Sequence, residues 1–216
     1  MSRLSDTFRR EKGKMQGMTF RKKVEYLVGN WWLEAFGVAV AIAVIVFLIN
    51  SGINASKTHL LYLAVVDVEL SGEQNESNCA AFKAYIGDDQ WQHVIAADTN
   101  VSSLGGTEVV NEDVTDYQQK SMILIGTGLV DAYICPERYV DFLAEYDEML
   151  PLSEVLDDSQ MEAYADRIEY GGYALRIDGT TGAESWNAAY EPAYLVVTRS
   201  VHFPEVVRAF VDFTLQ

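Results

Sequence analysis

The chain has 216 residues, with 32 acidic and 16 basic side chains and a net charge of −16. The charge is unevenly divided: residues 1–34 carry eight Lys/Arg against four Asp/Glu, a net +4, so residues 35–216 carry −20. A domain this acidic is excluded from holding DNA or RNA unaided, because neutralising phosphates requires Lys and Arg. The residues that follow position 56 are numerous enough for one domain with its own core.

A long apolar segment, residues 35–56, contains no charged side chain and is long enough to cross a hydrocarbon layer of about 30 Å. Trp31 and Trp32 precede it, where indole rings favour the membrane interface. Because eight basic residues lie on the N-terminal side, the positive-inside rule predicts that residues 1–34 are cytoplasmic and residues 57–216 lie outside. We therefore expect a single-pass protein of the cell membrane, with the lipid bilayer as a partner.

A cleaved signal peptide is the alternative reading of this segment. The basic region before it is long for a signal peptide, and "INAS" (53–56) lacks small residues at both key cleavage positions. A retained signal anchor fits better. Upstream, Phe20, Val24, Leu27 and Trp31 recur at helical spacing beside three basic residues, which predicts an interfacial amphipathic helix leading into the span. A docking site for a cytoplasmic partner is the other interpretation of that pattern.

Runs of apolar and β-forming residues predict strands along the outer domain, residues 57–216. The expected strands are 59–66, 91–97, 129–135, 173–177 and 193–198. Capping and proline signals between them predict helices. Ser77 and Asn78 precede a helix that stops at Gly87. Thr115 or Asn111 precedes a second helix, which runs to Ile125. Pro136 and Pro204 mark the starts of two more helices. Strands that alternate with helices predict a three-layer α/β sandwich with a mostly parallel sheet.

The glycines in "IGTGLVDAYIC" (125–135) raise the question of a phosphate loop. Gly126 and Gly128 end a helix and a strand follows, which is typical of a helix C-terminus. A phosphate loop has the opposite order, with a strand, then glycines, then a helix whose N–H groups face the anion. The stretch therefore predicts a helix-to-strand turn.

Cys79 and Cys135 are the two cysteines of the chain. In the predicted topology one starts a helix after the first strand and the other ends the third strand, so both are expected at the same edge of the sheet. That placement allows a disulfide. Two buried free thiols are the alternative, and no CxxC redox motif is present.

The sequence offers little support for catalysis. It has no GxSxG, no HExxH and no Cys/His spacing typical of a metal site, so we expect no enzyme, metal or cofactor. Ligands of open α/β sheets gather beyond the carboxyl ends of strands. The candidate ligand-binding residues there are Asp67, Ser77, Asn78, Asp98, Thr99 and Thr115, with Trp186 in a loop as a stacking platform. Helix capping, and packing of Trp186 onto the sheet, are the alternative roles.

Three stretches resemble known proteins. Residues 118–156, with Gly128, Leu129-x-Asp131 and Leu150-Pro151-Leu152, resemble extracellular solute-binding proteins of the type 2 periplasmic-binding fold. Residues 194–215 are similar to the strand and following helix with which the chain of those proteins returns to the same lobe, here called the returning strand and helix. Residues 23–32 resemble an uncharacterised group of membrane-anchored bacterial proteins.

The resemblance implies a binding module. Because about forty residues separate the Leu-Pro-Leu turn from the returning strand, we expect one lobe, with a small flap formed by residues 157–192. The partner would be a small solute, a membrane transporter or another envelope protein. A structural or adaptor protein of the envelope without a small ligand is the alternative.

Overall fold

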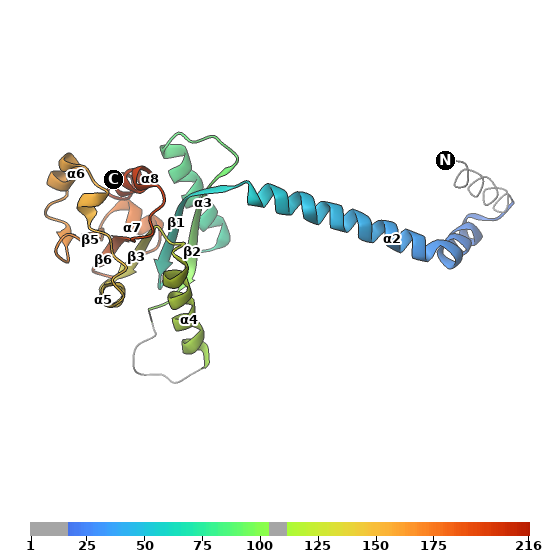
Figure 1. The fold of residues 1–216 in the computed structure, drawn as a ribbon, viewed down its shortest axis with the longest axis horizontal. Helices are drawn as coiled ribbons and strands as arrows, with labels where there is room; N and C mark the ends of the chain where they lie inside the picture. The colour runs from blue at the N-terminus through green and yellow to red at the C-terminus, as the bar shows by residue number, and fades with distance from the viewer. Residues whose placement is uncertain (1–16, 104–111) are drawn as a thin grey trace. The chain divides into compact units, whose positions relative to one another are not determined.

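The computed structural model describes residues 17–103 and 112–216. The chain divides into two units, which meet between Ser56 and Lys57. Figure 1 shows the first unit as helix α2 (Phe20–Ala55). Within it, Phe36–Ala55 is long and apolar enough to cross a membrane, a property that N-terminal signal sequences share.

The expected amphipathic segment is continuous with this helix. Phe20 and Trp32 are exposed. The side chains of Val24, Leu27 and Trp31 lie outside the described part of the chain, so the predicted apolar face remains a prediction.

The second unit is built on a six-stranded sheet in the order β2-β1-β3-β6-β5-β4. Its strands are β1 (Thr58–Val66), β2 (His93–Val101), β3 (Ala132–Pro136), β4 (Ile168–Glu169), β5 (Ala174–Arg176) and β6 (Ala193–Val197). Strand β1 pairs in parallel with β2 and β3, whereas the β3–β6, β6–β5 and β5–β4 pairs are antiparallel. The sheet is therefore mixed, and the prediction of a mostly parallel sheet is not confirmed.

Strands β4 and β5 of the antiparallel half come from the segment expected to form a flap, residues 157–192. Strands β4 and β5 are joined by only four residues, 170–173, and a connection this short allows only antiparallel pairing. Both strands are too short for a clear alternating pattern. Residues 157–192 thus extend the same sheet rather than forming a separate flap.

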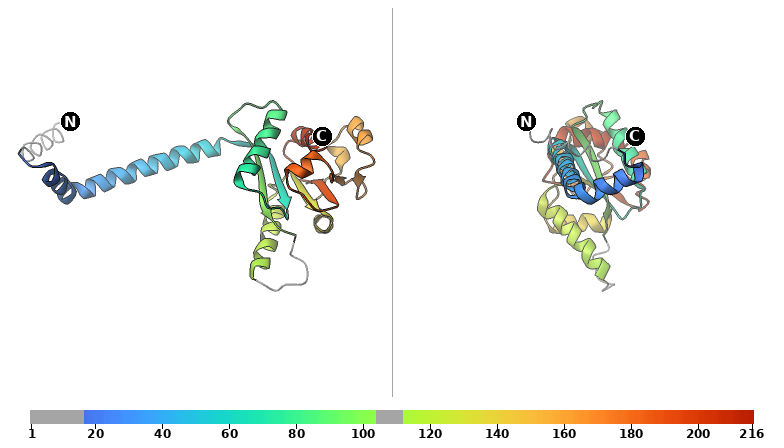
Figure 2. Two further views of the ribbon diagram at one scale, coloured as in Figure 1. Left: turned by 180° about the vertical axis from the view of Figure 1, so that it is seen from behind. Right: turned by 90° about the vertical axis from the view of Figure 1, so that its right-hand side faces the viewer.

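Helices cover both faces of this sheet (Figures 1 and 2). On the first face, α3 (Gly72–Tyr85), α7 (Thr181–Ser185) and α8 (Pro204–Thr214) surround one buried cluster. On the second face, α4 (Glu112–Thr127) and α5 (Glu137–Glu145) cover another. The short 3₁₀ helix η1 (Leu152–Glu154) and helix α6 (Asp158–Ala163) precede β4.

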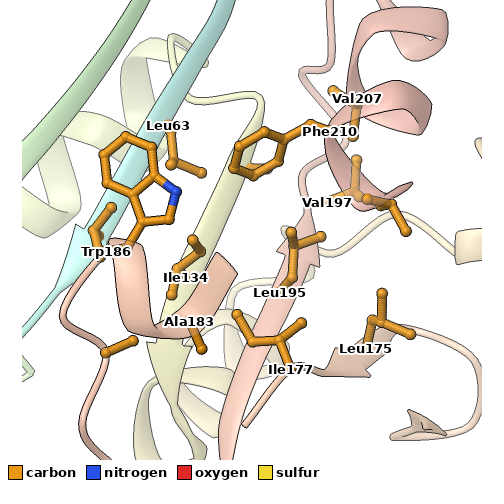
Figure 3. Close-up of a cluster of buried hydrophobic side chains, with 14 of the residues drawn as sticks. Leu63, Ile134, Leu175, Ile177, Ala183, Trp186, Leu195, Val197, Val207 and Phe210 are labelled. Carbon is orange, nitrogen blue, oxygen red and sulfur yellow. The ribbon is translucent and has the colours of Figure 1, made fainter. Parts of the chain in front are cut away.

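Alternation along the strands assigns side chains to these faces, because successive residues of a strand point to opposite sides. Leu63 and Val65 of β1 enter the first cluster, whereas Ala64 and Val66 enter the second. Figure 3 shows Leu63, Ile134 and Leu195 from three strands in one cluster with Trp186 and Phe210. The core is thus two apolar layers separated by the sheet.

Helix α3 begins earlier than the sequence analysis expects. Ser71 is its N-cap: the Ser71 hydroxyl accepts from the Gln74 N–H, and the Gln74 side chain accepts from the Ser71 N–H. This capping box satisfies N–H groups at both of its positions. The prediction that Ser77 or Asn78 caps the helix is therefore wrong, since both lie inside it.

The helix-to-strand turn of residues 125–135 is confirmed. Helix α4 ends at Thr127, and Gly128 follows with φ +59°, the left-handed conformation that favours glycine after a helix. Gly126 lies in the last turn of the helix. Pro136 is the N-cap of α5. Thr115 lies within α4, and Asn111 lies outside the described residues.

Candidate functional site

The carboxyl ends of β1 and β2 border a groove. Strand β2 lies on one side of β1 and β3 on the other, and the helices that lead to them, α3 and α4, cover opposite faces of the sheet. The strand order therefore reverses at β1, which is where open α/β sheets place their ligands. The groove has a volume of about 500 Å³ and is lined by Asp67, Val68, Glu69, Thr99, Asn100, Val101, Ser102 and Arg138.

Asp67, the residue after β1, organises this groove. Its Oδ1 accepts hydrogen bonds from the Ser102 hydroxyl at 2.8 Å and the Ser103 N–H at 2.9 Å. Its Oδ2 accepts from Nη2 of Arg138 at 2.7 Å and from the Ser103 hydroxyl. Burial by itself would raise the pKa of Asp67, but the hydrogen bonds from Ser103, Arg138 and Ser102 outweigh it and lower the pKa. Asp67 is therefore an ionised anchor at neutral pH.

Arg138 is the cation of the groove and lies in the first turn of α5. Its side chain is 57% exposed, whereas that of Asp67 is 16% exposed. Nη2 is the guanidinium nitrogen that bonds Asp67. Within the described residues, Nε and Nη1 make no hydrogen bond, so each can donate to one oxygen of an anionic acceptor such as a carboxylate or phosphate.

Tyr190 does not line the groove, but it packs against the first-face core and has an unpaired hydroxyl. The oxygen is buried and has no hydrogen-bond partner among the described residues. Burial raises the pKa of Tyr190, and the nearby Cys135 and Asp67 raise it further. The hydroxyl thus stays protonated and retains a donor that nothing described in the domain accepts.

The structure brings only part of the predicted site together. Asp67 and Thr99 line the groove. Asp98 bonds Lys120 of α4 at 2.8 Å and the Asn100 N–H at 3.0 Å, so it ties β2 to α4. The Asn78 amide donates to the Ser185 carbonyl at 2.7 Å and links α3 to α7.

The remaining candidates lie elsewhere. Ser77 is exposed in the middle of α3. The side chain of Thr115 lies outside the described residues. Trp186 is 1% exposed within the first-face core, so the expectation of a stacking platform is wrong and the alternative, packing onto the sheet, is what the fold adopts (Figure 3).

The predicted disulfide is also absent: Cys79 and Cys135 are free. Cys79 of α3 packs against the first face, whereas Cys135 of β3 belongs to the cluster on the second face. The expectation placed both at one edge but ignored the alternation of side chains along β3. Burial raises the pKa of Cys79 to about 11 and also raises that of Cys135. Both thiols are therefore poor nucleophiles.

Sequence reasoning missed Arg138, Ser102 and Ser103. Arg138 follows Pro136 at the carboxyl end of a buried strand, and that position could have marked it as a groove residue. The two serines follow β2 in a polar loop. Their composition is that of any loop, so no sequence signal distinguishes them.

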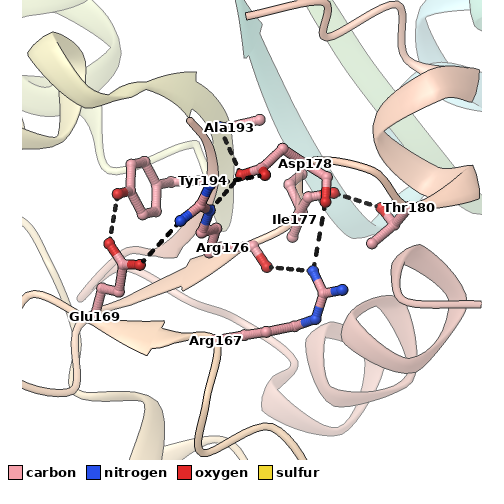
Figure 4. A network of polar contacts seen from close by, with 8 residues as sticks. All are labelled: Arg167, Glu169, Arg176, Ile177, Asp178, Thr180, Ala193 and Tyr194. Atoms are coloured by element: carbon pink, nitrogen blue, oxygen red, sulfur yellow. Dashed lines mark hydrogen bonds and ion pairs between the residues drawn. The ribbon is translucent and has the colours of Figure 1, made fainter. Parts of the chain in front are cut away.

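A second polar cluster, drawn in Figure 4, lies around β4 and β5. Arg176 bonds both oxygens of Asp178, at 2.7 and 3.1 Å, and the Tyr194 hydroxyl donates to Glu169 at 2.5 Å. Arg167 donates to the carbonyls of Arg176 and Asp178. These groups satisfy one another, so the cluster serves to hold the antiparallel half of the sheet.

In the described part of the chain, no three His, Cys, Asp or Glu side chains are grouped so as to hold a metal ion. Comparison with protein-family models, curated proteins and solved structures gave no significant match. The resemblance to solute-binding proteins therefore depends on the sequence pattern alone.

Proposed function

We propose that this chain is a single-pass membrane protein whose outer domain, residues 57–216, binds a small polar solute in the Asp67–Arg138 groove without transforming it. The observation that carries the proposal is the pairing of an ionised, half-buried Asp67 with a more exposed Arg138 inside a groove of about 500 Å³. Small-molecule sites typically have volumes of about 300–1,000 Å³ and few polar groups that orient the ligand.

The chemistry of the groove favours a solute with an anionic group. Asp67 fixes the guanidinium of Arg138 through Nη2. A carboxylate or phosphate of the solute would bond the remaining N–H donors, while Thr99 and Asn100 would contact its hydroxyl or amide groups. Asp67 would not bind the anion itself, because its ionised carboxylate has no hydrogen-bond donor and repels a like charge.

Membrane anchoring is supported by the apolar stretch Phe36–Ala55 and by the excess of basic residues before it. We place the N-terminus in the cytoplasm and the domain outside the cell on the positive-inside rule. The relation to solute-binding proteins is supported by the sequence patterns of residues 118–156 and 194–215. With one sheet, binding would proceed without closure of two lobes.

Thermal unfolding of the full chain in detergent micelles tests the proposal. A library of small carboxylates, phosphates, sugars and amines is screened for a rise in the unfolding temperature, because a ligand that binds only the folded state stabilises it. We expect an anionic solute to raise it. Arg138→Gln is expected to abolish that rise.

The matched control is Arg199→Gln. Arg199 is 51% exposed and bonds Asp147 at 2.6 Å, so it resembles Arg138 in exposure and pairing but does not line the groove. This variant is expected to keep the rise. A screen without any stabilising solute would contradict the proposal and favour an adaptor that contacts an envelope protein or a transporter. The exposed side chains of Ile123 and Leu129 would be a starting point for that contact.

A further inference from the structure

Trp91 is an exposed tryptophan on a loop that is fixed in place. Its side chain is 62% exposed, in the segment between α3 and β2. Nζ of Lys83 donates to the carbonyls of Gln90 and His93, at 2.7 and 2.6 Å. Asp88 accepts from the Gln90 N–H at 3.2 Å and lies 3.0 Å from Nδ1 of His93. The residues on both sides of the indole are therefore held, while the indole itself is presented to the surroundings.

This loop lies beside the start of the outer domain. The Thr58 N–H donates to the Gln92 carbonyl at 2.8 Å, and Thr58 pairs with His93. Only Ser56 and Lys57 separate Thr58 from Ala55, the last residue of the apolar helix. Three Cα–Cα steps span at most about 11 Å, whatever orientation the domain takes. Trp91 is thus within a short reach of the point where the chain would leave the membrane.

The two ends of the apolar segment differ in their aromatic residues. Trp31 and Trp32 precede it, whereas residues 48–61, at its other end, contain no Phe, Trp or Tyr. Tryptophan is enriched at both membrane interfaces, because its ring is apolar and its N–H seeks a polar partner. Trp91, whose loop bonds Thr58, is a candidate for the indole that the local sequence lacks at this end.

We propose that Trp91 is an interfacial anchor that inserts into the headgroup region of the bilayer crossed by α2. This inference depends on the proposed anchoring. In this position Trp91 would hold the amino edge of the sheet at the lipid surface. The Asp67 groove, at the other end of the nine-residue strand β1, would then lie about 30 Å from that edge. Because Lys83 pairs with Asp88, zwitterionic lipid is sufficient for this contact.

Fluorescence quenching by brominated phosphatidylcholine tests the inference on the full chain in proteoliposomes. One variant, Trp31→Phe with Trp32→Phe, retains Trp91 and the buried Trp186. A second adds Trp91→Phe. A third, Trp91→Phe alone, retains the two tryptophans that precede the span. Trp186, at 1% exposure in the core, serves as an internal reference in each.

We expect brominated lipid to reduce the Trp91 emission of the first variant roughly twofold and to leave the second variant unchanged. The positional control adds Glu73→Trp to the second variant. Glu73 is exposed in the first turn of α3, at the carboxyl edge of the sheet, so its new indole is expected to escape quenching.

The three variants and the Glu73→Trp control separate the possible failures. If Trp91→Phe alone is quenched but the first variant is not, the apolar helix still anchors the chain in the membrane. Trp91 then does not contact lipid, which overturns the inference. If neither is quenched, the proposed anchoring itself fails. If the Glu73→Trp control is quenched as strongly as Trp91, the contact is not specific to the amino edge, and the inference is likewise overturned.

Discussion

Asp67 and Arg138 are 71 residues apart in sequence, and a hydrogen bond of 2.7 Å joins the Oδ2 atom of Asp67 to Nη2 of Arg138 where β1 and β3 end. Three segments meet at this contact: the end of β1, the first turn of α5, and Ser102 and Ser103 after β2. The Asp67 carboxylate therefore connects the loops of the groove as well as fixing its cation.

Asp67→Asn is expected to lower the free energy of unfolding at pH 7 by about 1–3 kcal/mol, because hydrogen bonds to a charged group are lost. The pKa of Asp67 is lower in the folded state. Its contribution is thus fully present above the unfolded pKa of about 3.9 and disappears as the pH falls through the lower folded value. Urea unfolding at pH 7, 5 and 3.5 should show the difference between the two proteins narrowing at the lowest pH.

Asp147→Asn is the control for that substitution. Asp147 pairs with Arg199, but its side chain is 80% exposed, so the change is expected to alter stability by less than about 0.5 kcal/mol. Equal effects at the two positions would mean that Asp67 is an ordinary surface carboxylate.

Both cysteines are expected to remain thiols. In native protein at pH 8, iodoacetamide should modify Cys79 slowly, because its pKa is raised to about 11, and should leave the buried Cys135 unmodified. After unfolding without a reductant, mass spectrometry should find two adducts. A chain that gains adducts only after reduction would contain the disulfide that the fold argues against.

Gly182→Ala is expected to destabilise the domain by about 1–3 kcal/mol, the range for overpacking a tight contact. A Cβ at position 182 of α7 would overlap the backbone of Thr214 in α8. Gly126→Ala is the matched control, because open space surrounds Gly126 in the last turn of α4. Alanine there should stabilise by up to about 1 kcal/mol through helix propensity. Thermal unfolding of the two variants in parallel would reveal whether the α7–α8 contact is as close as described.

The long, strongly apolar elements could be predicted from the sequence. Strands β1, β3 and β6 are continuous apolar runs, and Gly128 and Pro204 mark helix boundaries by their own backbone preferences. These signals are local, so the sequence alone contains them.

The errors came from features that depend on register or on distant partners. The separation of Cys79 from Cys135 depends on which face each strand residue occupies. Trp186 follows a five-residue helix whose position on the sheet no local pattern indicates. The apolar run that begins after Ser77 and Asn78 predicts a cap there, whereas the capping box of Ser71 with Gln74 sets the helix start. Arg138 joins the groove only once β1 and β3 are neighbours.

The orientation of the outer domain tests the central claim most directly. Cells that produce the full chain with a C-terminal epitope tag are treated with proteinase K while intact, and again after lysis. We expect the tag to be lost from intact cells while a fragment containing the apolar helix is protected. A tag that survives until lysis would place residues 57–216 inside the cell and contradict the account.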